Sequence, residues 1–287
     1  MNAWVEAARP RTLSAGVAPV IVGTAAAGTL ILWRAVAALI VSLALQVAVN
    51  LANDLSDAHR GVDTGTRRGP RRAISSGLIS PHAMKKAIVL TLVVAGLAGL
   101  ALAAVVGWEL LGVGLAAMVA ALAYSGGPRP YGSAALGEVM VFLFFGVVAT
   151  AGSAYVQDEA FRFAALIASI PVGLLAAAIL VVNNLRDIPT DRDANKITVA
   201  VALGADRTVM LYRGLVLASV LSLPLIAFVV SSPWPLLATI AVVVAVTPVR
   251  EVQTSVAPTT LIAALGATAR LQFVFAFLLA VGLWISS

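Results

Sequence analysis

The chain has 287 residues, of which 61% are hydrophobic and 11% charged, and its mean hydropathy is +1.00. Soluble domains are nearer to half apolar and a quarter charged, so this composition predicts an all-α polytopic membrane protein. The absence of cysteine excludes disulfides, thiol nucleophiles and cysteine-bound zinc, and two histidines argue against a histidine-built metal site. The excess positive charge lies beside apolar segments, which favours an anionic substrate and orientation in a lipid bilayer over nucleic-acid binding.

Nine stretches are apolar over about the 20 residues that a membrane-spanning helix needs. Pro19 and Gly16 predict a kink in the first of them. No change in composition marks a second domain, so we expect a single transmembrane domain over residues 1–287. The predicted spans lie at roughly 13–32, 35–55, 85–106, 109–124, 135–156, 163–184, 209–231, 234–249 and 258–285.

Lysine and arginine are distributed very unequally between the two ends of these spans. If the chain crosses the membrane nine times, sixteen of these basic residues lie on the side that holds the N-terminus. Arg34 and Arg162 lie on the other side, and Arg270 lies within the last span. Short loops rich in lysine and arginine stay in the cytoplasm. We therefore expect a protein of the cell membrane whose N-terminus and two long polar loops, at about 56–84 and 185–208, are cytoplasmic, and whose C-terminus lies outside.

The first group of polar residues stands at the cytoplasmic end of the second predicted span. Asn50, Asn53, Asp54 and Asp57 follow the spacing i, i+3, i+4 and i+7, which places them on one face of a helix. Carboxylates at the depth of a membrane are costly, so this stripe predicts a functional site with a cation as its partner.

A second group ends the sixth predicted span in the same way. Asn183, Asp187 and Asp191 are spaced i, i+4 and i+8, and Asn184 falls beside them. A single acid such as Asp206 is expected to be a solvated helix cap. Two clusters with matched helical phase on one side of the membrane predict instead a shared site.

The two clusters suit a divalent cation and a phosphate. Mg²⁺ prefers oxygen ligands, usually one or two carboxylates together with substrate phosphates. Basic residues, which bind phosphate, follow each cluster. The combination predicts a Mg²⁺–diphosphate pocket, and its place at a membrane interface predicts a diphosphate on a lipid tail. These basic residues are Arg60, Arg67, Arg68, Arg71 and Arg72 after the first cluster, and Arg186, Arg192 and Lys196 in and after the second.

Four blocks of sequence carry a resemblance to a known family. They are Arg9-Pro-Arg-Thr-Leu13, Asn53-Asp54-Leu-Ser-Asp57 with Asp63, Tyr124-Ser-Gly-Gly-Pro-Arg-Pro-Tyr-Gly132 with Glu138, and Asn183-Asn-Leu-Arg-Asp187 with Asp191 and Lys196. In these blocks the chain resembles the UbiA superfamily of intramembrane aromatic prenyltransferases. The block from Tyr124 to Gly132 resembles, within it, the MenA branch of menaquinone synthesis.

The resemblance implies nine helices around a central cavity and a Mg²⁺-dependent reaction. A polyprenyl group from polyprenyl diphosphate would join 1,4-dihydroxy-2-naphthoate, releasing diphosphate and CO₂ and giving demethylmenaquinone or demethylmenaquinol. The implied Mg²⁺ ligands are Asn53, Asp54, Asp57, Asp187 and Asp191, supported by Asn50, Asn183 and Asn184. The implied diphosphate contacts are Arg60, Arg71, Tyr124, Arg129, Arg186 and Lys196. Two candidates remain for the base that deprotonates the acceptor phenol: Asp63 and a carboxylate near the second cluster.

Three other interpretations fit parts of the sequence. An enzyme of the same superfamily for 4-hydroxybenzoate, homogentisate, a chlorophyllide or haem would use the same aspartates, although the block at Gly126–Gly132 resembles the MenA branch. A cation-coupled transporter would also place carboxylates in broken helices, but transport sites lie near the bilayer midplane and these aspartates lie at the ends of spans. A structural membrane subunit would leave both acidic clusters unexplained.

Overall fold

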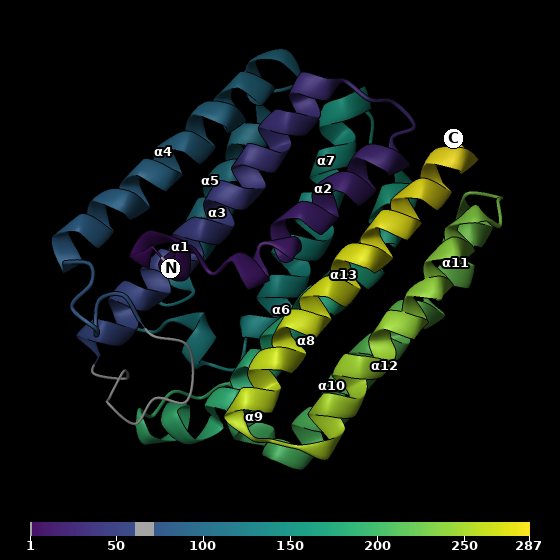
Figure 1. Cartoon of the computed structure of the whole chain (residues 1–287). Helices are drawn as coiled ribbons and strands as arrows, with labels where there is room; N and C mark the ends of the chain where they lie inside the picture. The colour runs from purple at the N-terminus through teal and green to yellow at the C-terminus, as the bar shows by residue number, and fades with distance from the viewer. Residues whose placement is uncertain (1, 61–71) are drawn as a thin grey trace.

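A computed structural model describes residues 2–60 and 72–287 (Figure 1). The described residues form helices and contain no strand, which confirms the predicted all-α fold class. The predicted site residues Asp63 and Arg71 lie outside the described residues. The helices are α1 (Ala3–Ala8), η1 (Pro10–Thr12), α2 (Ser14–Ala26), α3 (Leu32–His59), α4 (Pro81–Val105), α5 (Glu109–Ala123), η2 (Tyr131–Ser133), α6 (Gly137–Val141), the π-helical η3 (Phe142–Val148), α7 (Ala149–Asp158), α8 (Phe163–Asp193), α9 (Val199–Leu203), α10 (Ala205–Leu221), α11 (Leu223–Val229), η4 (Trp234–Ala241), α12 (Val242–Thr254) and α13 (Pro258–Ser286).

Seven helical segments in the described ranges are long and apolar enough to cross a membrane. The two other predicted spans correspond to shorter apolar helices, because α2 has 13 residues and α5 has 15. Helix α2 ends early because Gly28 turns the chain with a φ of 68°, a conformation that favours glycine. The count of nine spans therefore stays a prediction. The seven segments are Leu32–His59, Pro81–Val105, Gly137–Asp158, Phe163–Asp193, Ala205–Val229, Trp234–Thr254 and Pro258–Ser286.

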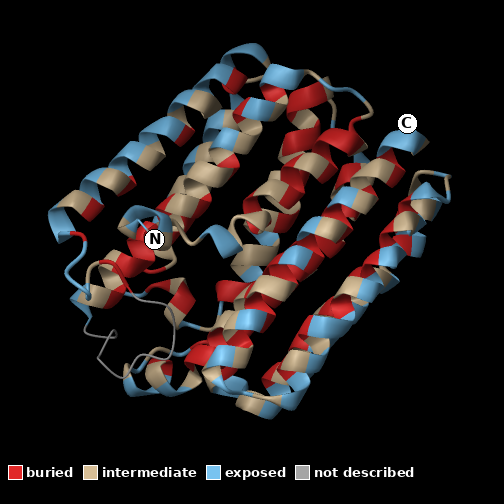
Figure 2. Ribbon diagram, viewed as in Figure 1, coloured by how far each residue is buried: buried red, intermediate tan, exposed pale blue. Residues whose placement is uncertain are grey.

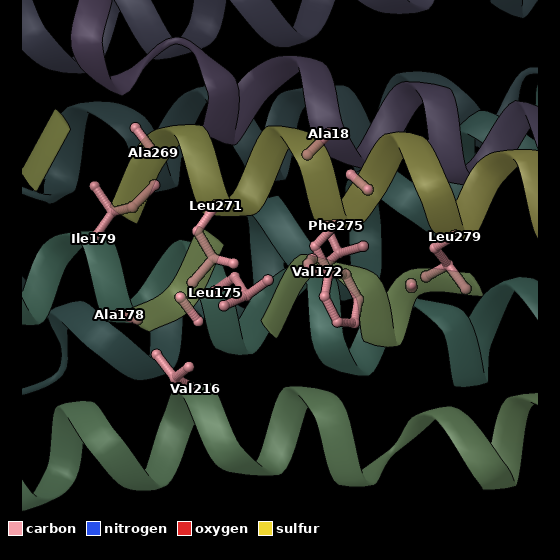
Figure 3. Close-up of a cluster of buried hydrophobic side chains, with 14 of the residues drawn as sticks. Ala18, Val172, Leu175, Ala178, Ile179, Val216, Ala269, Leu271, Phe275 and Leu279 are labelled. Carbon is pink, nitrogen blue, oxygen red and sulfur yellow. The ribbon is translucent and has the colours of Figure 1, made fainter. Parts of the chain in front are cut away.

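Helix α8 is the centre of the fold. In its most apolar stretch 72% of the residues are buried, against 22% for α4 at the edge of the bundle. Val172 and Leu175 of α8 belong to one core cluster with Phe275 of α13, Ala18 of α2 and Val216 of α10 (Figure 3). Because lipid tails are as apolar as these side chains, close packing rather than the exclusion of water holds such helices together.

The outward faces of the peripheral helices are exposed (Figure 2), and many of the exposed residues are large and apolar. Val89, Leu90 and Leu97 on α4 and Val243 on α12 are each at least 60% exposed. A continuous surface of this kind is unfavourable in water and matches the hydrocarbon of a bilayer. The distribution supports the predicted membrane environment.

The fold brings the acidic ends of α3 and α8 to the same end of the bundle. The loop before α6 and the loop after α8 meet there, where the backbone N–H of Ala135 donates to the carbonyl oxygen of Ile197 at 2.8 Å. At the opposite end, the buried Arg34 of α3 pairs with Glu159 at 2.9 Å and donates to the carbonyl oxygen of Val156 at 3.1 Å. The first turn of α3 is thus fixed to the end of α7, away from the acidic ends.

Candidate active site

Helix α3 carries the first acidic cluster on its buried face, where its four polar side chains are only 2–7% exposed. Oδ2 of Asp57 accepts a hydrogen bond from Arg72 at 2.6 Å, within a buried ion pair. Oδ2 of Asp54 accepts from the backbone N–H of Ala73 at 3.0 Å. The two carboxylates therefore attach residues 72 and 73 to the end of α3.

Asn50, on the same stripe, contacts the N-terminal segment. Its Nδ2 donates to the carbonyl oxygen of Ala8 at 2.9 Å and to Oγ1 of Thr12 at 3.3 Å. Gln46, one turn earlier, also donates to Oγ1 of Thr12, at 3.3 Å. These two amides hold the turn between α1 and α2 against α3.

The second acidic cluster ends α8. Nε and Nη2 of Arg186 donate to the two carboxylate oxygens of Asp187 at 2.8 and 2.6 Å, and Nη2 also donates to Oδ1 of Asn183 at 2.9 Å. Oδ1 of Asp191 lies 3.4 Å from Nζ of Lys196. Each cluster thus contains one aspartate in a close pair with a buried arginine.

Asn184 has a different partner. Its Nδ2 donates to Oε1 of Glu138 at 2.9 Å, and both side chains are buried. Glu138 stands in the first turn of α6, at the end of the loop that begins at Tyr124. This bond ties α6 to α8 directly behind the site.

A small polar cavity of about 60 Å³ lies between the end of α3 and the loop after α8. Asp57 and Arg60 line it from the end of α3, and Lys196 lines it from the loop after α8. Ser125 forms a further wall, and its carbonyl oxygen accepts from the hydroxyl of Ser56 at 2.6 Å. The end of the first acidic cluster and the loop that follows the second cluster therefore face one shared space.

A larger cavity of about 250 Å³ runs from this polar space toward the other end of the bundle. Its walls are mainly apolar side chains of α3, α5, η3, α7 and α8, and it reaches as far as Val156, beside the Arg34 network. Asn53 and Tyr124 line both cavities. These two residues mark the junction between a charged compartment and an apolar one.

Tyr124 is held at this junction by the turn that follows it. The backbone N–H of Gly132 donates to the carbonyl oxygen of Tyr124 at 3.0 Å, and a Cβ atom at Gly132 would collide with that oxygen at 2.6 Å. Tyr131 packs edge-on against the Tyr124 ring, with 5.5 Å between ring centroids.

Two buried carboxylate oxygens fit a metal ion. Oδ1 of Asp54 and Oδ2 of Asp191 receive no hydrogen bond from any described residue. A buried carboxylate oxygen without a donor is unfavourable unless a cation meets it. Within the ranges that the structure describes, no three acids or histidines converge as a preformed metal site. This donor set therefore fits Mg²⁺ bound by one or two carboxylates and completed by substrate phosphate and water.

The structure distributes the predicted phosphate-binding residues over different positions. Arg60 lines the polar cavity and donates to the carbonyl oxygen of Gly127 at 3.0 Å. Lys196 also lines it, whereas Arg186 is engaged with its own neighbour in the sequence. Arg129 is exposed and lines neither cavity among the described residues.

Three site residues have positions that the sequence did not indicate. Arg72 was one of several arginines expected to bind phosphate, and the structure pairs it with Asp57 instead. Glu138 lies within a predicted span, so the rule that drew attention to the aspartates, an acid at membrane depth, could have identified it. Arg9 lines the apolar cavity. Its membership of the N-terminal block Arg9–Leu13, which resembles the UbiA superfamily, was the one feature of the sequence that pointed to it.

Comparison with known sequences identifies relatives over most of the chain. The profile of the UbiA prenyltransferase family matches residues 16–255. A 1,4-dihydroxy-2-naphthoate octaprenyltransferase of Mycobacterium tuberculosis is 45% identical, over 80% of this chain and 79% of the relative. The protein of the same name from Bacillus subtilis is 31% identical, over 97% of this chain and 91% of the relative.

The fold is also similar to solved structures. A UbiA homologue from Archaeoglobus fulgidus, bound to GPP and Mg²⁺, superposes with a TM-score of 0.67 at 17% identity, covering 96% of this chain and 99% of that one. At this identity the match concerns the fold alone.

Proposed function

This chain belongs to the UbiA prenyltransferase family, and we propose that it transfers a polyprenyl group from polyprenyl diphosphate to 1,4-dihydroxy-2-naphthoate. The products are diphosphate, CO₂ and demethylmenaquinone, formed first as demethylmenaquinol. Relatives at 31–45% identity carry the name of this activity. The whole chain acts as one catalytic domain in the cell membrane.

One observation carries the proposal: a polar cavity between the end of α3 and the loop after α8 adjoins an apolar cavity, and Asn53 and Tyr124 line both. A polyprenyl diphosphate has the same division, with a charged head and a hydrocarbon tail joined at the reacting carbon. With the head in the polar space and the tail in the apolar space, the reacting carbon lies at the junction.

The residues of the polar cavity suit a diphosphate. Arg60 and Lys196 supply positive charge to its oxygens. Asp54 and Asp191 do not line the cavity, but Asp54 stands one helical turn before Asp57 and Asp191 pairs with Lys196, both of which do. We assign these two carboxylates to Mg²⁺, because each has a buried oxygen without a described donor. When bound, Mg²⁺ would neutralise charge on the diphosphate and so favour its departure. Arg72 and Arg186 fix the remaining pair, Asp57 and Asp187, by close ion pairs.

The junction suits a carbon that becomes positive. The diphosphate leaves with the electron pair of the C–O bond, and the ring then bonds to the prenyl carbon with the electron pair released by the departing CO₂. Tyr124 and Tyr131 present neutral aromatic rings there, and the face of an aromatic ring attracts positive charge. The apolar walls exclude water, which would otherwise capture the cation.

The function is tested with purified protein in detergent, supplied with 1,4-dihydroxy-2-naphthoate, a polyprenyl diphosphate and Mg²⁺. The expected product has the mass of the prenylated ring after loss of CO₂. Parallel reactions contain 4-hydroxybenzoate or homogentisate, and a higher kcat/KM for one of these would assign a different acceptor. If the protein transports labelled substrate into vesicles and forms no prenylated product, the protein is a transporter and not an enzyme.

A bulky side chain in the apolar cavity should discriminate between long and short donors. Gly114 on α5 lines this cavity, and a Cβ there meets open space. We expect Gly114→Phe to lower kcat/KM for a long polyprenyl diphosphate about five- to a hundredfold, the range of a steric cost of about 1–3 kcal/mol, and to spare geranyl diphosphate. Gly112→Phe is the matched control, because Gly112 also has open space around it but does not line the cavity. Equal losses with both donors would contradict this path for the tail.

We also propose that the acidic end of the bundle faces the cytoplasm, with the N-terminus inside and the C-terminus outside. Sixteen lysines and arginines support this orientation. The two basic residues of the opposite end, Arg34 and Arg162, are both paired with acids, Glu159 and Asp158. In intact cells a tag at the C-terminus should react with an impermeant label, and a tag at the N-terminus should react only after lysis. Two tags of equal accessibility would overturn both the orientation and the odd number of spans.

A further inference from the structure

We propose that Arg9 binds the carboxylate of the aromatic acceptor, an inference that rests on the proposed function. Among the described residues that line the apolar cavity, Arg9 is the one with a charged side chain. The acceptor brings a carboxylate into this cavity, and a carboxylate in apolar surroundings is strongly disfavoured unless a cation meets it. Arginine suits this task, because its guanidinium can donate two parallel hydrogen bonds to one carboxylate and has further donors for other partners.

The backbone at Arg9 is fixed in an unusual conformation. Arg9 has φ 53° and ψ 68°, in the left-handed region that residues other than glycine rarely adopt. Its carbonyl oxygen accepts from the backbone N–H of Thr12 at 2.9 Å and from the Thr12 hydroxyl at 3.0 Å. Asn50 of α3 holds the preceding carbonyl group, that of Ala8, at 2.9 Å. Such a conformation persists only where the surroundings fix it, and here it delivers one side chain to the cavity.

Basic residues other than Arg9 are available to bind the diphosphate. Arg60 and Lys196 line the polar cavity, and Arg9 is not among the described residues that do. Arg9 nevertheless lines the same apolar cavity as Asn53 and Tyr124, the two residues that line both cavities. An acceptor held by Arg9 would therefore lie on the apolar side of the junction, beside the reacting carbon of the donor.

The test compares an acceptor that has the carboxylate with one that lacks it. Wild type and Arg9→Met are supplied with 1,4-dihydroxy-2-naphthoate or with 1,4-dihydroxynaphthalene, the latter assayed as a competitive inhibitor if it does not react. We expect Arg9→Met to raise KM for the naphthoate about 10- to 100-fold, the range of a lost charge-assisted hydrogen bond. The constants for dihydroxynaphthalene and for the polyprenyl diphosphate should stay within about twofold, because neither carries this carboxylate. Arg11→Met is the matched control, since Arg11 is exposed and does not line the cavity.

Arg9→Lys provides a second measurement that does not depend on the folding of Arg9→Met. It keeps the charge but loses the paired donors, so KM for the naphthoate should be intermediate while that for dihydroxynaphthalene is unchanged. An equal loss of affinity for both acceptors, or a change confined to the diphosphate, would overturn the assignment. The wild type reports on the proposed function separately. If it prenylates neither acceptor, the proposed function fails; if it prenylates the naphthoate and Arg9→Met matches it, only the role of Arg9 fails.

Discussion

Asp54→Asn is expected to lower turnover at least about a hundredfold, equivalent to about 2.7 kcal/mol of transition-state stabilisation, in a protein that still folds. Oδ2 of Asp54 accepts a hydrogen bond from the N–H of Ala73, and the asparagine oxygen can keep this bond. The substitution removes the negative charge shared by Oδ1, to which no described residue donates. The defect should therefore concern the binding of Mg²⁺ and diphosphate rather than the structure of α3.

Thermal unfolding in detergent separates these two effects. A ligand that binds the folded state raises Tm, so Mg²⁺ with a diphosphate analogue should stabilise the wild type and should stabilise Asp54→Asn much less. Asp206→Asn is the matched control, because it removes the same charge from the exposed first turn of α10 and should leave turnover and the Tm shift unchanged. Near-wild-type turnover of Asp54→Asn at limiting Mg²⁺ would exclude Asp54 as a metal ligand.

The equivalent change in the second cluster has a different physical consequence. Asp187 accepts two hydrogen bonds from Arg186, and the exposed fractions of their side chains are 12% and 4%. Breaking such a buried pair typically costs about 3–5 kcal/mol, because it leaves a charge uncompensated. Asp187→Asn therefore perturbs stability as well as charge. The sequence treats Asp54 and Asp187 as equivalent, and only the contacts separate them.

Helical phase was sufficient to predict where the polar stripes point. The spacing from Asn50 to Asp57 leaves one side of the helix polar, and in apolar surroundings that side turns toward the protein interior. All four polar residues of this stripe are buried, as that argument requires. The two acidic ends also lie at one end of the bundle, as expected from the concentration of lysine and arginine at one end of the predicted spans.

Helical phase does not determine what each side chain meets, because the partners come from distant parts of the chain. Asn50 contacts Ala8, and Asn184 contacts Glu138, across separations of 42 and 46 residues. Arg72 pairs with Asp57, and no periodic pattern in the sequence between them predicts this contact. The end of a helix, by contrast, depends on single residues. Gly28 ends α2 by its positive φ, which hydropathy averaged over a window cannot detect.

The site offers the prenyl group surroundings that suit a carbocation. Tyr124 and Tyr131 line the apolar cavity with aromatic rings, whose faces attract positive charge. The chain contains no cysteine that could attack the cation. The larger cavity is lined mainly by alanine, valine, leucine and phenylalanine, which exclude water. These features favour a mechanism in which the C–O bond of the donor breaks before the new C–C bond is complete.

A donor that carries fluorine beside the reacting carbon should therefore react about a hundredfold or more slowly, since each ~1.4 kcal/mol added to the barrier costs about tenfold. Fluorine withdraws electrons and destabilises the cation, but it leaves the diphosphate and the tail unchanged. The fluorinated analogue should accordingly compete with the natural donor, with a Ki close to the KM of the natural donor. Single-turnover measurements establish whether chemistry limits the rate with each donor. If chemistry is limiting and the fluorinated donor reacts as fast as the natural one, no cation develops, and the acceptor carbon must displace the diphosphate directly.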